Sequence, residues 1–597
     1  MKNRTLAALL AIALLLAVLP TASLALTVPK VSQPATVKGE PVGISPSNFP
    51  DEIFMEYVST TYDTNNDGVL SEEELSVDYI SVPFLGVSDL SGIEYFTAIT
   101  VLYCSFNQLT RLDVSRNTAL ESIFCSDNQL TELNVSGCTA LNYLDCANNQ
   151  LTELDVSGNP ALARLYCSTN QLTELNVSNN PALVELYCIE NMLTELDVSS
   201  SPQLSVLYAS FNQLTELNIS NNPALTTVGC PDNLLTEIDV SNCPALVRLS
   251  CFDNQLTELD LSGNPMLGFL YCENNQLTEL DVSSNPALMY MYCADNQLTE
   301  LDISNNPELI NLYCQNNRLT ELDLSNNPEL RELDIASNMF AEFPNLSGNS
   351  NLSFLVCSDC QLDEIDISSV PTLRTLDCSD NNLTELDVSN NAWIDFLDCS
   401  GNQLTELDVS NNPELWQLDC SDNNLTELDV SSNFRLENLF CDNNALTSLN
   451  IRYCVNINEF SCDQNSYAAN FTADGTFDLS TLPGSFDVSK ASNWVGGSVQ
   501  GNILTLDEGA DEVTYTYDCG MDKIATFTIR VDGSTLGIPG DANGDGAVDT
   551  ADAVLVMRHA LNLITLSDEA AALCDMNGDG EITILDATLV MRAALGF

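Results

Sequence analysis

The chain contains few of the residues on which most enzymes and nucleic-acid-binding proteins depend. It has one histidine, His559, in 597 residues, which leaves little material for general acid–base catalysis. Lysine and arginine total 18 against 85 aspartates and glutamates, and the resulting net charge of −67 repels nucleic acid and anionic lipid. No segment after the N-terminus is apolar enough to cross a bilayer. These shortages predict an acidic protein that binds calcium or basic partners.

The N-terminus has the pattern of a secretory signal. Two basic residues precede an apolar run at 6–19, and small residues then lead to Ala25. The run is short for a membrane anchor, which needs roughly 20 apolar residues, so export is the better interpretation. We therefore predict that residues 1–25 are a signal peptide and that residues 26–50, rich in Pro, Ser and Thr, form a flexible leader.

An internal repeat dominates the chain. The text from Cys272 to Leu288, C-E-N-N-Q-L-T-E-L-D-V-S-S-N-P-A-L, recurs with few changes at a step of 21 residues. The repeating cysteines are Cys104, Cys125, Cys146, Cys167, Cys188, Cys230, Cys251, Cys272, Cys293, Cys314, Cys357, Cys378, Cys399, Cys420, Cys441 and Cys462. The pattern resembles the leucine-rich repeat L-x-x-L-x-C-x-x-N-x-L. It predicts a mainly β solenoid with parallel strands at residues 81–470.

The repeat also indicates which side chains point inwards. Leu270 and Cys272 belong to the strand's inner face, and Asn275 is placed to satisfy backbone groups at the bend, in a ladder along the solenoid. A single turn cannot bury its own apolar face, so stability is a sum over neighbouring turns. Eighteen turns at about 4.8 Å each predict a rod of roughly 85 Å. The alternation in L-T-E-L-D-V predicts a second extended strand on the opposite face and a flat arc.

The 22 cysteines suggest two interpretations. An exported protein commonly forms disulfides, but Ala209 and Ile335 fill the same repeat position, as expected of a small buried hydrophobe. Cys357 and Cys360 form one C-x-x-C pair, and Cys360 stands where other turns have asparagine. We predict buried, reduced thiols.

The residue before the repeating cysteine faces outwards on the predicted concave side. It forms two tyrosine stripes, made of Tyr166, Tyr187 and Tyr208 and of Tyr271, Tyr292 and Tyr313. Such stripes suit stacking against sugar rings or packing on a protein, although aromatic residues also pair across strands without any ligand. A further ladder of Glu258, Glu279, Glu300 and Glu321 is interpreted as a solvated acidic face.

A calcium loop is predicted near the N-terminus. The segment D-T-N-N-D-G-V-L-S-E-E-E at 63–74 fits the twelve-residue EF-hand loop, in which Gly68 permits the sharp turn and Leu70 points inwards. The segment has no sequence mate, so residues 51–80 are interpreted as a cap that leads into the first repeat. The expected ligands are Asp63, Asn65, Asp67, the Val69 carbonyl, Ser71 and Glu74.

Two further loops lie at the C-terminus. D-A-N-G-D-G-A-V-D-T-A-D from Asp541 recurs 34 residues later as D-M-N-G-D-G-E-I-T-I-L-D from Asp575, and a similar helix follows each copy. Residues 540–597 therefore resemble a type I dockerin of cellulosome-like assemblies, which implies two calcium ions. The ligands implied by the resemblance are Asp541, Asn543, Asp545, Ala547 (carbonyl), Asp549 and Asp552, and then Asp575, Asn577, Asp579, Glu581 (carbonyl), Thr583 and Asp586.

The same resemblance implies a partner, the cohesin domain of a scaffoldin protein. Its contact positions map to Thr550, Ala551 and Arg558 in the first copy and to Ile584, Leu585 and Arg592 in the second. The two sets differ from each other and from the Ser-Thr pair of familiar members, so cohesin type and binding orientation stay open. His559, beside Arg558, is interpreted as a packing or rim residue.

The remaining residues complete the predicted organisation. Alternation in T-Y-T-Y and A-T-F-T-I-R-V predicts a small β-sandwich at 471–533, which would cover the edge of the solenoid, and residues 534–539 form a linker. The predicted fold is thus a β solenoid with a small β domain and an α-helical dockerin.

Two classes of function follow from this organisation. The first is a secreted, non-catalytic protein, associated with an extracellular complex or a cell surface, that docks on cohesins and binds a protein or polysaccharide with its arc. The alternatives are an enzyme of polysaccharide degradation, disfavoured because the chain has no catalytic domain or nucleophile motif, and a cell-surface adhesin. We predict no nucleic-acid partner and no membrane span.

Overall fold

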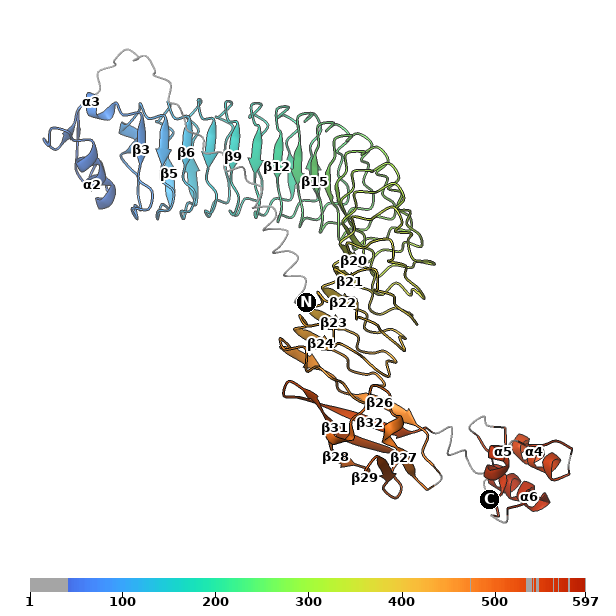
Figure 1. Cartoon of the computed structure of the whole chain (residues 1–597). Coiled ribbons are helices and arrows are strands. Elements are labelled where there is room, and N and C mark those ends of the chain that lie inside the picture. Colours follow the sequence, from blue (N-terminus) through green and yellow to red (C-terminus); the bar gives the residue numbers. More distant parts are fainter. Residues whose placement is uncertain are drawn as a thin grey trace.

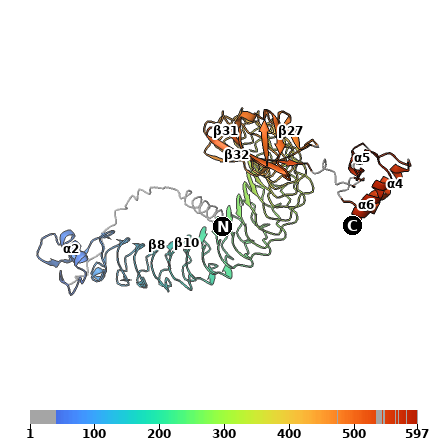
Figure 2. The ribbon, with the colours of Figure 1, turned by 90° about the horizontal axis from the view of Figure 1, so that it is seen from below.

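The computed structural model describes residues 41–472, 474–532, 540, 542–543, 547–561, 563–566, 568–577 and 580–595. The predicted signal peptide, most of the leader and the linker 534–539 lie outside these residues. Figure 1 shows the strands of the solenoid side by side along a curved array, and Figure 2 shows the curvature from a perpendicular direction.

One long parallel sheet runs the length of the solenoid and confirms the predicted fold class. Consecutive strands pair in register at the repeat spacing, for example Leu249 with Leu270 and Leu270 with Met291. In order the strands are β3 (Tyr79–Ser81), β4 (Val101–Tyr103), β6 (Ser122–Phe124), β8 (Tyr143–Asp145), β9 (Arg164–Tyr166), β10 (Glu185–Tyr187), β12 (Val206–Tyr208), β14 (Thr227–Gly229), β15 (Arg248–Ser250), β16 (Phe269–Tyr271), β17 (Tyr290–Tyr292), β18 (Asn311–Tyr313), β19 (Glu332–Asp334), β20 (Phe354–Val356), β21 (Thr375–Asp377), β22 (Phe396–Asp398), β23 (Gln417–Asp419), β24 (Asn438–Phe440) and β25 (Glu459–Ser461).

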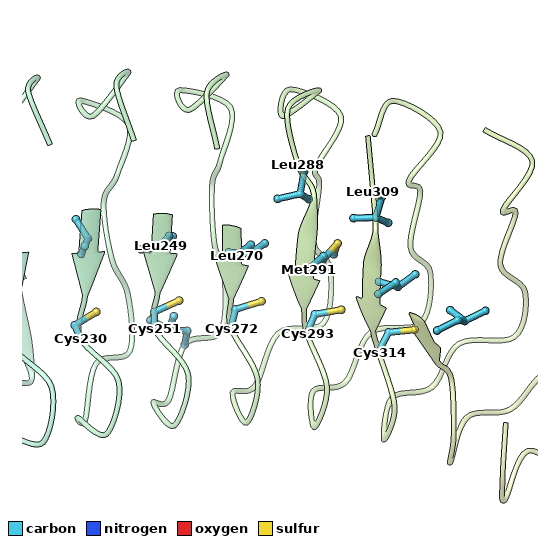
Figure 3. Packing of buried hydrophobic residues seen from close by; sticks show 14 of the residues in the cluster. Cys230, Leu249, Cys251, Leu270, Cys272, Leu288, Met291, Cys293, Leu309 and Cys314 are labelled. Atoms are coloured by element: carbon cyan, nitrogen blue, oxygen red, sulfur yellow. The ribbon is translucent and has the colours of Figure 1, made fainter. Parts of the chain in front are cut away.

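The core is the stack of inward residues from each turn. Leu270, Cys272 and their counterparts one turn away are fully buried. Figure 3 shows the cysteines from Cys230 to Cys314 in one column, with their side chains pointing in the same direction. Parallel thiols of this kind are poorly oriented for disulfide formation. All 22 cysteines are free and buried, as the sequence predicted.

The predicted second strand forms in only part of the solenoid. The L-T-E-L-D-V segment pairs as β5 (Arg111–Asp113) with β7 (Glu132–Asn134), and as β11 (Glu195–Asp197) with β13 (Glu216–Asn218). At both places an extra backbone hydrogen bond joins the turns, such as Thr215 N–H to Thr194 O at 2.9 Å. The other described turns keep this segment extended without strand pairing.

The predicted asparagine ladder links each turn to its neighbours. Asn275 Nδ2 donates to the carbonyls of Cys272 and Glu273 in its own turn and of Cys251 in the preceding turn, at 3.1–3.2 Å. Its Oδ1 accepts from Leu256 N–H at 2.9 Å. One side chain therefore satisfies four backbone groups at a buried bend.

A second asparagine ladder, which the sequence analysis missed, occupies the N of the N-P-A-L motif. Asn285 is fully buried, and its Nδ2 donates to Leu261 O at 3.0 Å and Asn264 O at 2.9 Å. Its Oδ1 has no hydrogen-bond partner among the described residues. Only the donor is used, so a thiol can replace the amide: Cys138 Sγ, at the same repeat position, donates to Val114 O at 3.2 Å.

The residue before the first ladder adopts a left-handed backbone in turn after turn. Asn274 has φ of 52° and Asp295 has φ of 53°. Asn and Asp tolerate this conformation better than other side chains, which accounts for the repeated N-N and D-N pairs.

The N-terminal end of the core is capped by helices and aromatic residues. Helix α2 (Glu52–Thr61) begins at the N-cap Asp51, which also accepts from Ser88 N–H at 2.8 Å. Helix α3 (Glu72–Leu75) begins within the last residues of the predicted EF-hand loop. The loop strand β2 (Val69–Leu70) pairs antiparallel with β1 (Val42–Gly43), a short strand that belongs to no second calcium loop. The buried rings of the cap are Phe49, Phe54, Tyr62 and Phe96.

A small β domain closes the other end, as the alternating pattern predicted. Tyr515 is buried and its hydroxyl donates to Thr447 O of the last turns at 2.6 Å, while Ile451 N–H donates to Cys519 O at 2.9 Å. One sheet has the order β26 (Asn465–Ala469), β32 (Lys523–Val531), β31 (Glu512–Gly520) and β28 (Ala491–Val495), and the other β27 (Thr476–Asp478), β30 (Ile503–Leu506) and β29 (Gly497–Gln500). The apolar edge of the solenoid is therefore covered.

The C-terminal module has a separate small core. Helices α4 (Thr550–Ala560) and α6 (Ile584–Ala594) pack together with α5 (Asp568–Cys574) around Val556, Val590 and Cys574.

The two asparagine ladders predict that the same substitution, Asn→Cys, lowers the free energy of unfolding by different amounts. Asn275→Cys leaves the Leu256 N–H without its acceptor and weakens three donated bonds, so it should cost about 3 kcal/mol. Asn285→Cys removes no used acceptor and should cost about 1 kcal/mol or less. Urea unfolding followed by circular dichroism measures both, with Asn305→Ser as an exposed control. Equal costs at the two positions would contradict the distinction.

Because the thiols are buried, we expect them to react only slowly with thiol reagents in the native protein. Burial raises the pKa of Cys188 and Cys230 to about 12, so the reactive thiolate is scarce at neutral pH. Ellman's reagent should detect almost no thiol in the native protein and all 22 after denaturation in guanidinium without reductant. A lower total in the denatured protein would reveal disulfides and contradict the free-thiol arrangement.

Candidate functional site

The N-terminal loop folds around its own carboxylates. Asp63 accepts from Asp67 N–H at 3.1 Å through Oδ1 and from Gly68 N–H at 2.9 Å through Oδ2. Asn65 Oδ1 accepts from Asp67 N–H at 2.8 Å, and Asp67 Oδ1 from Val69 N–H at 2.9 Å. Gly68 has φ of 80°, and Leu70 is fully buried, as predicted.

The last residue of this loop ties its two ends together. Glu74 Oε1 accepts from the backbone and hydroxyl of Thr64, and Oε2 accepts from the backbone and hydroxyl of Ser71, all at 2.8–2.9 Å. The hydrogen bonds from Ser71 and Thr64 lower the pKa of Glu74 to about 2. The carboxylate is thus held charged and oriented.

The first C-terminal loop repeats this arrangement. Asp552 is fully buried, and its Oδ1 accepts from Ala542 N–H at 2.9 Å and Asn543 N–H at 3.1 Å. Its Oδ2 accepts from Asp549 N–H at 2.8 Å. Position 12 therefore bonds to positions 2 and 9, as Glu74 does in the N-terminal loop.

The second C-terminal loop is closed in the same way. Asp586 is fully buried and accepts from Asn577 N–H at 3.3 Å and Thr583 N–H at 2.9 Å, and Gly580 N–H donates to Asp575 at 2.8 Å. Burial acts to raise the pKa of Asp586, but the bonds from Thr583 and Asn577 hold it below its usual value.

The donor sets fit calcium by their chemistry. All three loops offer only oxygen atoms, which hard cations prefer over nitrogen and sulfur ligands. Three of the predicted ligands, Asp541, Asp545 and Asp579, lie outside the described residues. Within the described part of the chain, no group of three or more His, Cys, Asp or Glu is arranged to hold a metal ion.

The predicted cohesin-contact residues are all exposed. They lie at the starts and along the outer faces of α4 and α6 and are Thr550, Ala551, Arg558, Ile584, Leu585 and Arg592. A hollow of about 250 Å³ between the two helices includes Val554, Met557 and Met591 in its lining and is bounded by Arg558. The two helices therefore offer a mostly apolar surface with an arginine at its margin.

His559 has a structural role in this module. Its Nδ1 accepts from Leu566 N–H at 2.9 Å, so the imidazole holds the chain that leaves α4. This agrees with the predicted packing role.

The tyrosine stripes lie on the outer face of the long sheet, where their rings stack on one another. The ring centroids of Tyr271 and Tyr292 are 5.0 Å apart, and those of Tyr292 and Tyr313 are 4.7 Å apart with planes inclined by 5°. The Arg248 guanidinium lies 5.4 Å from the centre of the Tyr271 ring. The ring faces are thus largely occupied within the protein.

The first stripe is longer than the sequence analysis recognised. Tyr103, Phe124 and Tyr143 extend the stack of Tyr166, Tyr187 and Tyr208 towards the N-terminus. The stack ends at Gly229, which has no side chain to continue it. A Cβ at this position would lie 2.6 Å from the Tyr208 ring, so a larger residue would clash.

A neighbouring row of side chains binds the hydroxyl groups. Tyr166 donates to Glu185 at 2.6 Å, and Tyr313 donates to Glu332 at 2.7 Å. Burial raises the pKa of Tyr292 to about 12, so the hydroxyl stays protonated at neutral pH. Spacing alone did not identify these glutamates, because each lies 19 residues after its tyrosine, on the next strand of the sheet.

Two acidic features complete the surface. The predicted glutamate ladder, with Glu279 and Glu300, lines an open groove of about 1940 Å³ on the opposite face, together with exposed aspartates such as Asp281. On the sheet face, burial raises the pKa of Glu273 to about 8, and Glu273 Oε2 has no hydrogen-bond partner among the described residues. The sequence analysis missed Glu273.

These features define the class of the protein as a leucine-rich-repeat solenoid that ends in a duplicated, carboxylate-closed loop module. Residues 539–595 match the family model of the dockerin type I domain. The structure of the functional domain of InlJ from Listeria monocytogenes, described as including a cysteine ladder, is 31% identical, with a TM-score of 0.54. The match covers 83% of this chain and 99% of that domain.

Two further matches are also to internalins of Listeria monocytogenes. The crystal structure of an internalin, inlF, is 23% identical over 57% of this chain and 98% of that one, with a TM-score of 0.45. Internalin J is 35% identical over 71 residues, which are 12% of this chain and only 8% of that protein's length.

The chain belongs to the internalin-like family of leucine-rich-repeat proteins, and it carries a C-terminal type I dockerin domain. Neither family is catalytic, and type I dockerins bind calcium. None of the helices among the described residues is long and apolar enough to span a membrane.

The low pKa of Glu74 predicts an acid-sensitive cap. A carboxylate whose folded pKa is depressed stabilises the fold above its unfolded pKa, near 4.5, and this contribution is lost as pH falls towards about 2. In metal-free protein, the gap in melting temperature between wild type and Glu74→Gln should therefore shrink between pH 5 and pH 2. The exposed Glu73→Gln is the control, and a pH-independent gap for Glu74→Gln would contradict the assignment.

Proposed function

We propose that this protein is a secreted, non-catalytic component of an extracellular, cellulosome-like complex. Its dockerin binds a cohesin on a scaffoldin in a calcium-dependent way, and its solenoid recognises a further partner. The observation that carries the proposal is the pair of loops closed by Asp552 and Asp586, whose helices present an exposed, mostly apolar surface. Docking and recognition are thereby assigned to different parts of the chain.

Calcium is proposed at three loops, two in the dockerin and one near the N-terminus. The dockerin ligands are those given by the resemblance, and the N-terminal ligands run from Asp63 to Glu74. The support for the third ion is the shared pattern in which Glu74, like Asp552, accepts from positions 2 and 9 of its loop. In this position the ion would link the cap to the first turns.

Cohesin contact is proposed at the exposed ends of α4 and α6. Thr550 and Ala551 are smaller and more polar than Ile584 and Leu585, while Arg558 and Arg592 correspond to each other. A cohesin could bind the duplicated module in two orientations, one centred on each copy. Because the contact residues of the two copies differ, the two orientations would have different affinities.

The sheet face of the solenoid is proposed to recognise a protein rather than a sugar polymer. A sugar ring packs on the free face of an aromatic side chain, but here the faces of Tyr271, Tyr292 and Tyr313 lie against one another. The edges and the hydroxyl–carboxylate pairs remain available, and these suit the polar contacts of a protein interface.

Export through residues 1–25, with cleavage after Ala25, is part of the proposal, as is association with a complex or a cell surface. An adhesin that uses the dockerin only for attachment is the alternative, and it predicts retention on cells rather than in a released complex. An enzyme of polysaccharide degradation is disfavoured by the non-catalytic families that make up the chain.

The test is binding of the chain from Leu26 onwards to cohesins of the same genome, measured by biolayer interferometry with calcium and then with excess chelator. We expect tight binding in calcium that is lost in chelator. The double variant Asp552→Asn and Asp586→Asn should weaken it at least about 100-fold, or about 2.7 kcal/mol.

The matched control is Glu74→Gln, which alters the N-terminal loop and should leave cohesin binding unchanged. Binding that persists in chelator would contradict calcium-dependent docking. Failure to bind any cohesin would make the adhesin the better proposal.

A further inference from the structure

The repeat changes its exposed residues near the C-terminal end of the solenoid. The motif N-P-A-L supplies proline and then alanine or glutamate in most turns, but Trp393 replaces the alanine and Phe434 and Val455 replace the proline. Trp416 lies four residues after the buried asparagine of its turn, whereas Trp393 lies two residues after its own. The chain has only three tryptophans, and two of them fall in this short stretch.

Stacking brings these side chains to one edge of the solenoid. Trp393, Trp416, Phe434 and Val455 come from four consecutive turns, just before β22 (Phe396–Asp398), β23, β24 and β25. Their exposed fractions are 55%, 39%, 56% and 63%, and Tyr453 beside them is 42% exposed. We call these five residues the aromatic edge. Four turns are separated by three steps of about 4.8 Å, so these residues extend over about 14 Å along the solenoid axis.

The rings of this edge differ from those of the tyrosine stripes. Within the described residues, no other ring stacks on Trp393 or Phe434, and Trp416 meets Phe396 only at a tilt of 56°. The contact of Trp393 is the Arg374 guanidinium, 5.8 Å from its ring. Trp393, Trp416 and Phe434 therefore keep much of their side-chain surface open to solvent, and exposed apolar surface of this kind often marks a binding site.

The local charge is balanced, although the whole chain is strongly acidic. Arg374 pairs with Asp395 at 3.3 Å, and Arg435 pairs with Glu414 in the next turns. An arginine also covers Tyr453, since the Arg452 guanidinium lies 4.5 Å from its ring centre. Because Arg374 and Arg435 are paired with carboxylates, the edge offers no unpaired charge from them to attract an ionic partner, which favours a neutral one.

We propose that the aromatic edge binds one extended chain of a neutral polysaccharide, laid along the solenoid axis. The apolar C–H faces of the sugar rings would pack on Trp393, Trp416 and Phe434. Exposed amides such as Asn456 would accept or donate hydrogen bonds to the hydroxyl groups.

The shape of the edge favours a polymer over a folded protein. Four half-exposed side chains offer roughly 400 Å² in a narrow line, about half of the ~800 Å² that a stable protein interface takes from each partner. A linear chain needs only a narrow line of contacts. The site is separate from the dockerin and from the sheet face, so its test does not depend on cohesin binding.

The experiment uses the chain from Leu26 onwards and soluble neutral polysaccharides of the β-glucan, xylan, mannan and α-glucan classes. Affinity electrophoresis measures retardation, and tryptophan fluorescence reports contact. We expect at least one polymer to retard the protein and to shift its fluorescence. Trp393→Ala combined with Phe434→Pro should raise the dissociation constant at least about tenfold.

These substitutions restore the residues that the repeat has in other turns, so the variant should keep the fold, as circular dichroism checks. Tyr292→Ala, on the sheet face, should leave polysaccharide binding unchanged, and Trp494→Phe should keep the fluorescence shift. Polygalacturonate, an anionic polymer, should not bind.

Absence of retardation by every neutral polymer would overturn the proposal. So would equal weakening by Tyr292→Ala, which would place the sugar on the tyrosine stripes. A folded protein that competes for this edge, with no polymer bound, would assign the surface to a protein partner instead.

Discussion

The hydrogen bonds that join each turn to the one before it are the constraint on which the whole molecule depends. Asn275 donates across the turn boundary to Cys251 O and accepts from Leu256 N–H, so its partners exist only when the preceding turn is in place. The same is true of the buried leucine and cysteine columns, whose contacts come from neighbouring turns. No turn is stable alone. The first and last turns lack a neighbour on one side, so each end of the array needs a cap that covers its exposed apolar edge.

Each end is closed by a different device. At the N-terminus, Asp51 caps α2 and also binds the backbone of Ser88 in the first repeats, so the helix and the solenoid share one carboxylate. At the C-terminus, the last ladder residue, Asn465, is also the first residue of β26, and the sheet of the β domain continues from it. The apolar edges are covered without interrupting the hydrogen-bond ladder.

Regular stacking also divides the surface of the solenoid into rows of like side chains. Residues at one repeat position form rows along the axis, and a row of tyrosines stacks on itself, which uses the ring faces and leaves hydroxyls paired with Glu185 and Glu332. Where the repeat deviates, at Trp393 and Phe434, no other ring of the described residues stacks on the side chain, and about half of each side chain stays exposed. The dockerin has a hydrophobic core of its own, separate from that of the solenoid.

The amino-acid sequence by itself determined the repeat length, the inward cysteine column, the first asparagine ladder and the calcium-loop pattern, because each depends on local spacing that recurs. It could not identify the second ladder, the pairing of β1 with β2, or Glu273, because their partners are distant or depend on side-chain direction. Only the tertiary structure decided that Tyr292 has no free ring face and that Trp393, Trp416 and Phe434 share one edge. These contacts form between side chains about 20 residues apart, which the solenoid places on adjacent turns. The repeat spacing indicates which residues are neighbours, but only side-chain packing decides which of them touch.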